Sequence, residues 1–189
     1  MDNAKFWDRL ARNYDDEVGE ETTAITRKYL RENDTVLDYG CARGSYTLAL
    51  AGDVKEIRGV DISPEMIKRA SAHSDSIRFD TGTIFDIDET FDVVLAFNIL
   101  HLVEDTERVL EKIDQILKPG GRFVSVTTCM NAQLLLRIAA FFTRLFGVLY
   151  LRGFTTSELE DLISRRFEIA EVKKFTDHHI LIVAKKTEF

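Results

Sequence analysis

The chain has 189 residues, of which 45% are hydrophobic and 30% charged, a composition typical of one globular domain and not of a disordered or fibrous chain. Its formal net charge of −7 argues against nucleic acid or anionic lipid as a partner, because clustered lysine and arginine bind phosphate. Cys41 and Cys129 have the spacing of neither a disulfide framework nor a zinc site, so we expect no metal site and a reducing, cytoplasmic setting.

The first 33 residues predict two helices in front of the main body of the chain. Residues 1–15 carry three aspartates and lack a basic head followed by an apolar run, so they do not resemble a secretory signal. Phe6 and Leu10, like Trp7 and Ala11, have the spacing of an apolar stripe on a helix. A second helical pattern covers residues 20–31.

Short apolar runs alternate with helical patterns from residue 35 onward. The runs predict strands at residues 35–39, 56–62, 76–80, 91–97 and 122–128, with helices after the first, second and fourth. Ser63 and Pro64 mark the start of one helix as N-cap and first helical residue, and Lys-Pro-Gly-Gly at residues 118–121 ends another. This alternation implies a parallel sheet with helical crossovers, the doubly wound α/β class.

The most apolar stretch spans residues 134–151, about the length of a short membrane span. Arg137 and Arg144 are two helical turns apart and share one face, which makes the stretch amphipathic and argues against a transmembrane helix. Such a helix can wall an apolar pocket, form the interface of a homodimer or pack in the core, and it leaves a peripheral membrane contact open.

The last part of the chain predicts a helix and a β-hairpin. Thr155 and Glu158 form a capping box, and Phe154 and Leu159 are placed as a hydrophobic staple, so a helix should begin here and end near residue 165. Strands are expected at residues 167–175 and 179–185. The link between them is too short for a parallel crossover, so the final strand must be antiparallel.

A glycine turn, Gly40-Cys41-Ala42-Arg43-Gly44, follows the strand that contains Asp38 and precedes a helix that begins near Ser45. A strand, a glycine turn and a helix at the carboxyl edge of a parallel sheet bind nucleotide-like ligands. Ala42 and Ser45 stand where a dinucleotide fingerprint needs glycine, and no P-loop lysine follows the turn. Asp61, at the end of the second strand, can accept hydrogen bonds from both ribose hydroxyls, a feature that NAD enzymes share.

Four motifs occur in order between residues 34 and 128. They are Val36-Leu37-Asp38-Tyr39-Gly40-Cys41-Ala42-Arg43-Gly44, Gly59-Val60-Asp61-Ile62-Ser63-Pro64-Glu65-Met66, Phe91-Asp92-Val93-Val94 and Leu117-Lys118-Pro119-Gly120-Gly121. With these motifs the chain resembles the class I S-adenosylmethionine-dependent methyltransferases, in particular the small-molecule, ubiquinone/menaquinone methyltransferase-like branch with a methyltransferase type 11 domain.

The resemblance implies a Rossmann-like, mostly parallel seven-stranded sheet whose last strand is antiparallel. It also implies one methyltransferase domain over residues 1–189. Within it we expect N-terminal helices at residues 1–33, a cofactor-binding core at 34–128, an apolar helical substrate-side segment at 129–165 and a terminal β-hairpin at 166–189.

The resemblance also assigns residues to the cofactor, S-adenosyl-L-methionine, which leaves as S-adenosyl-L-homocysteine. Gly40 and its neighbours would hold the methionine end, with Asp38 orienting the turn. Asp61 would bind the ribose, Ile62 would stack on adenine, and Asn98 would lie beside the methionine moiety. The expected cofactor-binding residues are Tyr14, Asp38, Gly40, Cys41, Ala42, Gly44, Asp61, Ile62, Met66, Thr83, Ile84 and Asn98.

Three of these positions carry an additional expectation. Thr83 stands where the family often has an acid that contacts the adenine amino group. Alanine disfavours the left-handed region, so we expect Ala42 to avoid positive φ. Tyr14 matches a tyrosine that folds over the cofactor in related enzymes, although an aromatic packed in the core has the same pattern.

Methyl transfer from a sulfonium is an in-line displacement that depends mainly on alignment, so a dedicated base is optional. The acceptor should be a small molecule, hydrophobic or aromatic if the helix at 134–151 walls the pocket. His101, at the carboxyl edge, is the candidate base or a packed helix-entry residue. His178 and His179 are alternative bases, or part of a solvated turn.

Two other functions compete with methyl transfer. One is a non-catalytic module that binds the cofactor or a partner protein on the same fold. The other is an NAD-dependent oxidoreductase, which Ala42 and Ser45 disfavour because both replace fingerprint glycines.

Overall fold

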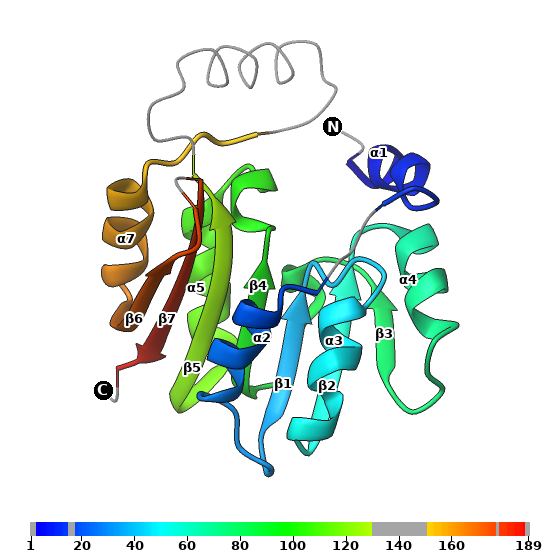
Figure 1. Ribbon diagram of the computed structural model, residues 1–189, viewed down its shortest axis with the longest axis horizontal. Helices are drawn as coiled ribbons and strands as arrows, with labels where there is room; N and C mark the ends of the chain where they lie inside the picture. The colour runs from blue at the N-terminus through cyan, green and yellow to red at the C-terminus, as the bar shows by residue number, and fades with distance from the viewer. Residues whose placement is uncertain (1–2, 15–17, 130–150, 177, 188–189) are drawn as a thin grey trace.

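The fold is organised around one seven-stranded sheet (Figure 1). The computed structural model describes residues 3–14, 18–129, 151–176 and 178–187. The strand order is β3-β2-β1-β4-β5-β7-β6, and only β7 runs antiparallel to its neighbours. The strands are β1 (Thr35–Tyr39), β2 (Glu56–Asp61), β3 (Arg78–Thr81), β4 (Phe91–Phe97), β5 (Leu117–Thr128), β6 (Phe167–Lys174) and β7 (His179–Lys186). The expected doubly wound α/β class and the antiparallel last strand are confirmed.

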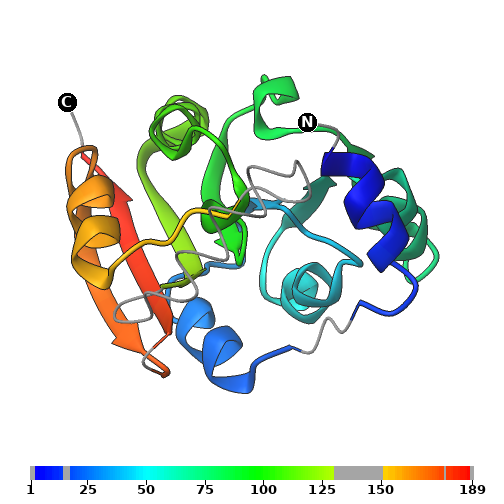
Figure 2. The ribbon, with the colours of Figure 1, turned by 90° about the horizontal axis from the view of Figure 1, so that it is seen from above.

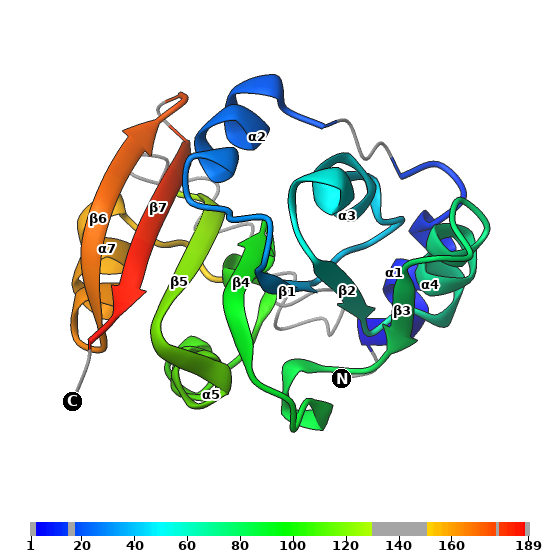
Figure 3. The ribbon, with the colours of Figure 1, turned by 90° about the horizontal axis from the view of Figure 1, so that it is seen from below.

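Helices cover both faces of this sheet, as the view from above shows (Figure 2). The helices α2 and α3 lie on one face, and α5 and α7 lie on the other. The helix α4 packs along β2 and β3, and α1 lies beside α4 (Figure 3). The helices are α1 (Asn3–Leu10), α2 (Glu20–Arg27), α3 (Ser45–Leu50), α4 (Pro64–Ser71), α5 (Thr106–Ile116) and α7 (Thr156–Ser164), with short 3-10 turns η1 (Ala51–Asp53), η2 (Ile84–Asp86) and η3 (Leu100–Leu102).

Local sequence signals explain where several elements begin. The side chain of Ser63 accepts a hydrogen bond from Met66 N, and Pro64 is the first residue of α4. Thr155 and Glu158 form the reciprocal capping box of α7, and Phe154 and Leu159 are fully buried beside it. In β4 the residues 93–97 are buried on both faces, as expected for a strand between two helical layers.

Charged side chains are also buried or half-buried near the amino ends of the strands. Arg122 donates a hydrogen bond to Asp34 at 2.7 Å, and both side chains are less than a tenth exposed. Asp92 accepts hydrogen bonds from Lys118 Nζ and from Thr35. Burial opposes ionisation of Asp92, but these hydrogen bonds prevail and lower its pKa to about 2.

Two boundaries differ from the sequence prediction by more than two residues. The strand β5 begins at Leu117, five residues before the expected start, because Leu117 pairs with Phe91 before an irregularity in the register. The helix α2 ends at Arg27, four residues before the expected end. The expected apolar helix at 134–151 lies outside the described residues, apart from residue 151, so its role stays a prediction. Among the described residues, no helix is both long and apolar enough to cross a membrane.

The strand order places a crevice at the carboxyl edge of the sheet. From β1 the chain moves outward to β2 and β3, and then crosses back to build β4 and β5 on the other side. The loops after β1 and β4 therefore diverge, and ligands of doubly wound sheets bind where this happens.

Candidate functional site

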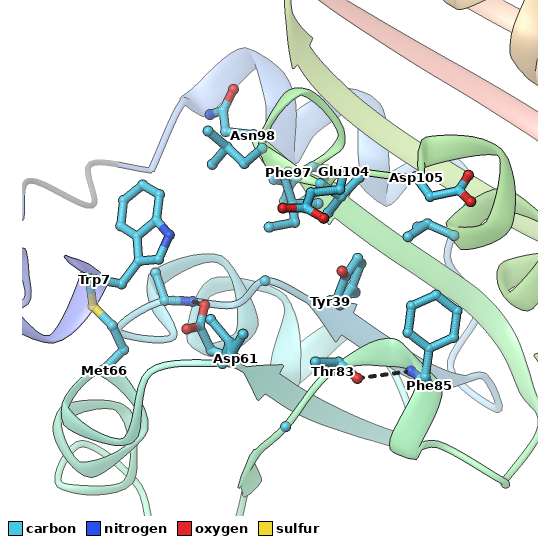
Figure 4. A pocket seen from close by; sticks show the side chains of 18 of the residues that line it. Trp7, Tyr39, Asp61, Met66, Thr83, Phe85, Phe97, Asn98, Glu104 and Asp105 are labelled. Atoms are coloured by element: carbon cyan, nitrogen blue, oxygen red, sulfur yellow. Dashed lines mark hydrogen bonds between the residues drawn. The ribbon is translucent and has the colours of Figure 1, made fainter. Parts of the chain in front are cut away.

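A pocket of about 330 Å³ opens at this crevice, within the range of small-molecule and cofactor sites (Figure 4). Its wall is formed by the loops that follow β1, β2, β3 and β4 and by the first segment of the chain. The lining residues are Trp7, Tyr14, Tyr39, Gly40, Ala42, Asp61, Ile62, Met66, Gly82, Thr83, Phe85, Phe97, Asn98, Ile99, Leu102, Val103, Glu104, Asp105, Arg108 and Val109.

The glycine turn after β1 brings its backbone to the pocket. Gly40 has φ +75°, and a Cβ at this position would lie 3.0 Å from side-chain atoms of Ile99. Glycine is therefore favoured here both by its backbone conformation and by the tight contact that a Cβ would make. Ala42 has φ +49°, so the expectation that position 42 avoids positive φ was wrong. The hydrogen bond from Ala42 N to Asp61 Oδ2, at 3.0 Å, offsets the cost of about 1–2 kcal/mol for this conformation.

Asp61 braces the turn and faces the pocket (Figure 4). One carboxylate oxygen accepts from Ala42 N at 3.0 Å and the other from Ser63 N at 2.9 Å. A carboxylate has about four lone-pair positions, so a group of this kind can accept more hydrogen bonds than these two. Burial raises the pKa of the neighbouring Tyr39 hydroxyl, and the charge of Asp61 raises it further, so Tyr39 stays a hydrogen-bond donor.

The turn after β3 is built on a capping box that the sequence contains as Thr83-x-x-Asp86. Asp86 Oδ2 accepts hydrogen bonds from the backbone and the hydroxyl of Thr83, both at 2.8 Å. These bonds lower the pKa of Asp86. The Thr83 hydroxyl donates to Asp86 and accepts from Phe85 N, so its donor is used within the turn. The aromatic face here belongs to Phe85, which is 41% exposed and lies beneath the guanidinium of Arg108, 4.7 Å from the ring centroid.

Asn98 closes the pocket beside the glycine turn. It adopts φ +55°, and its backbone N–H donates to Val126 O at 2.7 Å. Its side-chain Oδ1 is buried and has no hydrogen-bond partner among the described residues. A buried acceptor without a partner is costly, so this atom marks a position where a ligand donor would be stabilised.

The segment before the sheet supplies two aromatic residues to the pocket. Trp7 lies on α1, and its ring meets the ring of Tyr14 edge to face, with centroids 6.0 Å apart. The guanidinium of Arg43 donates to the carbonyl oxygen of Tyr14 at 2.9 Å. The glycine turn and the start of the chain are thus joined directly.

The family model described as a methyltransferase domain matches residues 30–175. The chain belongs to this family. It is 30% identical over 151 residues to the demethylmenaquinone methyltransferase of Symbiobacterium thermophilum. The aligned region covers 68% of this chain and 58% of the relative. It is 34% identical over 113 residues to the carboxy-S-adenosyl-L-methionine synthase of Colwellia psychrerythraea, and here the aligned region covers 53% of this chain and 46% of the relative. This methyltransferase-family chain thus spans about half the length of the curated relatives it matches.

Solved structures share the fold of this methyltransferase domain at low sequence identity. The N-methyltransferase NodS of Bradyrhizobium japonicum, solved with S-adenosyl-L-homocysteine, has a TM-score of 0.74 at 19% identity and covers 98% of this chain and 99% of its own. The YcgJ protein of Bacillus subtilis has a TM-score of 0.74 at 19% identity and covers 90% and 100%. The family predicted from the four motifs is therefore confirmed, together with its fold.

The methyltransferase fold brings most of the predicted binding residues into the pocket wall. Those that line it are Tyr14, Gly40, Ala42, Asp61, Ile62, Met66, Thr83 and Asn98, whereas Asp38, Cys41, Gly44 and Ile84 are not among the lining residues. Asp38 accepts a hydrogen bond from the hydroxyl of Thr47 at 2.6 Å and so connects β1 to α3. Gly44 has φ +80° as the N-cap of α3. The ligand contacts expected of all these residues stay predictions.

The three histidines predicted near the carboxyl edge gather there. His179 pairs with Thr128 at the end of β5, and the carbonyl of His178 accepts from Cys129 N. His101 is 8% exposed and is not among the residues that line the pocket. Burial, and secondly the charge of His179, lower the pKa of His101 to about 4, so its ring is neutral at pH 7.

The wall opposite the glycine turn was not predicted from the sequence. Leu102, Val103, Glu104, Asp105 and Arg108 all line the pocket and all follow β4. Asp105 also caps α5 by accepting from Arg108 N at 3.0 Å. The capping pattern was present in the sequence, but it marks a helix start and gives no sign of a pocket.

Proposed function

We propose that this chain is an S-adenosyl-L-methionine-dependent methyltransferase that acts on a small apolar or aromatic acceptor in the pocket at the carboxyl edge. The observation that carries the proposal is the position of Asp61: its carboxylate is anchored by two backbone N–H groups and still faces the pocket. A fixed carboxylate at this edge suits a ligand with a ribose diol.

The residues of the pocket fit the parts of this cofactor. Gly40 brings backbone without a side chain to the pocket, and the buried Oδ1 of Asn98 would accept from an ammonium group. Ile62 and Phe85, at 38% and 41% exposure, offer apolar surface to a planar base. When bound, S-adenosyl-L-methionine would supply an electrophilic methyl group on a positively charged sulfur.

The residues of this chain would act mainly by alignment and by exclusion of water. Trp7 and Tyr14 cover the pocket from the side of α1, and Phe97 and Leu102 add apolar wall. An acceptor held here needs no base unless it is protonated at neutral pH. For a protonated acceptor we retain His101 as the candidate base. Its test is His101→Gln, which should lower kcat for such an acceptor and shift the pH profile; an unchanged kcat removes His101 from the proposal.

The apolar character of the wall supports an apolar acceptor. The demethylmenaquinone methyltransferase of Symbiobacterium thermophilum is named for a quinone substrate, and it is 30% identical to this chain. We therefore expect phenols, catechols and hydroquinones to be methylated before polar amines or carboxylates are.

The test is an assay with methyl-labelled S-adenosyl-L-methionine and matched apolar and polar acceptors, read by mass spectrometry of both products. Transfer of label to an apolar acceptor, with binding of S-adenosyl-L-homocysteine and not of NAD, supports the proposal. Cofactor binding with no labelled product from any acceptor would favour a non-catalytic module. A cofactor product of increased mass would instead favour the reaction named for the Colwellia psychrerythraea relative, a carboxy-S-adenosyl-L-methionine synthase.

A further inference from the structure

Asp8, on α1, makes two hydrogen bonds to the first turn of α4. Its Oδ1 accepts from the hydroxyl of Ser63 at 2.5 Å and from the backbone N–H of Glu65 at 3.1 Å. The N-terminal N–H groups of a helix have no partner within the helix and favour a negative charge. Asp8 therefore serves as a cap for α4 that is supplied by another helix.

Ser63 connects Asp8 to the carboxylate of the pocket. Its backbone N–H donates to Asp61 Oδ1 at 2.9 Å, while its hydroxyl donates to Asp8 and accepts from Met66 N. Ser63 itself is fully buried, so water has little access to its ends of these bonds. The turn that presents Asp61 to the pocket is the same turn to which α1 is attached.

The attachment matters because α1 carries part of the pocket wall. Trp7 precedes Asp8 in the chain and lines the pocket, and Figure 4 shows its ring near Asp61 and Met66. Asp8 itself is not among the lining residues. The helix has only eight residues, which is too short to be stable without packing against the rest of the molecule.

We propose that Asp8 is a positioning residue: by binding the first turn of α4 it places α1 over the pocket, and cofactor affinity depends on the wall that α1 then provides through Trp7. The inference rests on the proposed function for the identity of the ligand. It concerns Asp8 alone, and the position of α1 can be tested without any ligand.

Trp7 is the one tryptophan of the chain, so intrinsic fluorescence reports its surroundings directly. The experiment uses the full chain and compares the unsubstituted protein with Asp8→Ala, Asp8→Asn and Arg9→Ala. Asparagine keeps an Oδ1 that can accept from Ser63 and Glu65, so Asp8→Asn should act as a conservative rescue. Arg9 is exposed on the same helix, and Arg9→Ala is the matched control.

Without ligand, Asp8→Ala should shift the Trp7 emission to longer wavelength and increase its quenching by acrylamide. Calorimetry should show S-adenosyl-L-homocysteine binding weakened about tenfold, because α1 loses both of the hydrogen bonds that Asp8 makes to the first turn of α4. Asp8→Asn and Arg9→Ala should stay within about threefold of the unsubstituted protein. In a protein that already carries Trp7→Ala, the further change Asp8→Ala should cause no additional loss of affinity, because both changes remove the same wall.

The inference is overturned if Asp8→Ala leaves both the emission of Trp7 and the affinity unchanged, or if its loss of affinity adds fully to that of Trp7→Ala. Circular dichroism shows whether a variant has unfolded as a whole. We expect α4 to persist in Asp8→Ala, because the Ser63 hydroxyl still accepts a hydrogen bond from Met66 N. If the unsubstituted chain bound no S-adenosyl-L-homocysteine, the proposed function would fail, whereas the emission of Trp7 would still decide whether Asp8 positions α1.

Discussion

The substitution Asp61→Asn is the sharpest test of how the pocket binds its ligand. In the native chain both oxygens of the carboxylate accept backbone N–H groups, from Ala42 at 3.0 Å and from Ser63 at 2.9 Å. Asp61→Asn changes almost no volume, but it replaces one oxygen by an NH2 group. One backbone donor must then face another donor, and the charge that would attract ribose hydroxyls is lost.

The magnitude follows from the bonds that change. A hydrogen bond to a charged group contributes about 1.5–3 kcal/mol, so we expect the free energy of unfolding to fall by roughly that amount. The ligand loses one charged acceptor as well, which should weaken S-adenosyl-L-homocysteine binding about 10- to 100-fold. The loss of stability tests whether Asp61 fixes the glycine turn, and the loss of affinity tests whether Asp61 binds the ribose.

Urea unfolding and calorimetry at 25 °C separate the two effects. Asp88→Asn is the matched control, because Asp88 is an exposed carboxylate after η2 and lies outside the pocket wall. The control should change neither measurement. A folded Asp61→Asn protein that binds S-adenosyl-L-homocysteine within about threefold of the native protein would refute the ribose assignment, whatever its stability.

Three further predictions concern the framework around the pocket. Gly40→Ala should lower the free energy of unfolding by at least about 1–2 kcal/mol, because φ is +75° at this position. In the control Gly52→Ala the new Cβ meets open space, so the free energy of unfolding should stay within about 0.5 kcal/mol of the native value. Equal losses in the two variants would contradict the conformational argument. Arg122→Met should cost about 3–5 kcal/mol in urea unfolding because it leaves Asp34 buried and charged, and adding Asp34→Asn should recover part of this loss. Asp92, whose folded pKa is about 2, should contribute roughly 2 kcal/mol that is present above about pH 4 and lost as the pH falls toward 2; Asp92→Asn should flatten this part of the stability curve.

The sheet could be predicted from the sequence because its signals are local. Strands β1 and β4 have the expected bounds, since each is a short apolar run between polar or turn-forming residues. The start of β5 could not be predicted, because Leu117 extends the strand only through its pairing with Phe91 on a neighbouring strand. Nothing in residues 117–121 by themselves indicates that Leu117 will pair with a residue of β4.

The pocket residues that belong to the sequence motifs could also be predicted, with one wrong expectation, at Ala42. The rule that alanine avoids positive φ is a statement about an isolated residue. At Ala42 the carboxylate of Asp61, nineteen positions away, accepts the backbone N–H and favours the left-handed conformation. The prediction of the Ala42 conformation failed because it rested on the preference of alanine alone, which takes no account of a tertiary hydrogen bond.

The two walls of the pocket therefore differ in how freely they can change. The wall at the glycine turn is made of backbone that is fixed by Asp61 and by positive φ values, so most substitutions there should disturb the fold as well as the ligand. The opposite wall consists of side chains from one short turn and the start of α5, namely Leu102, Val103, Glu104, Asp105 and Arg108, and its cap at Asp105 is local. Side chains there can be exchanged without breaking the sheet. If the proposed function holds, changes in acceptor preference should therefore come first from Leu102, Val103 and Glu104, while the wall at the glycine turn stays constant.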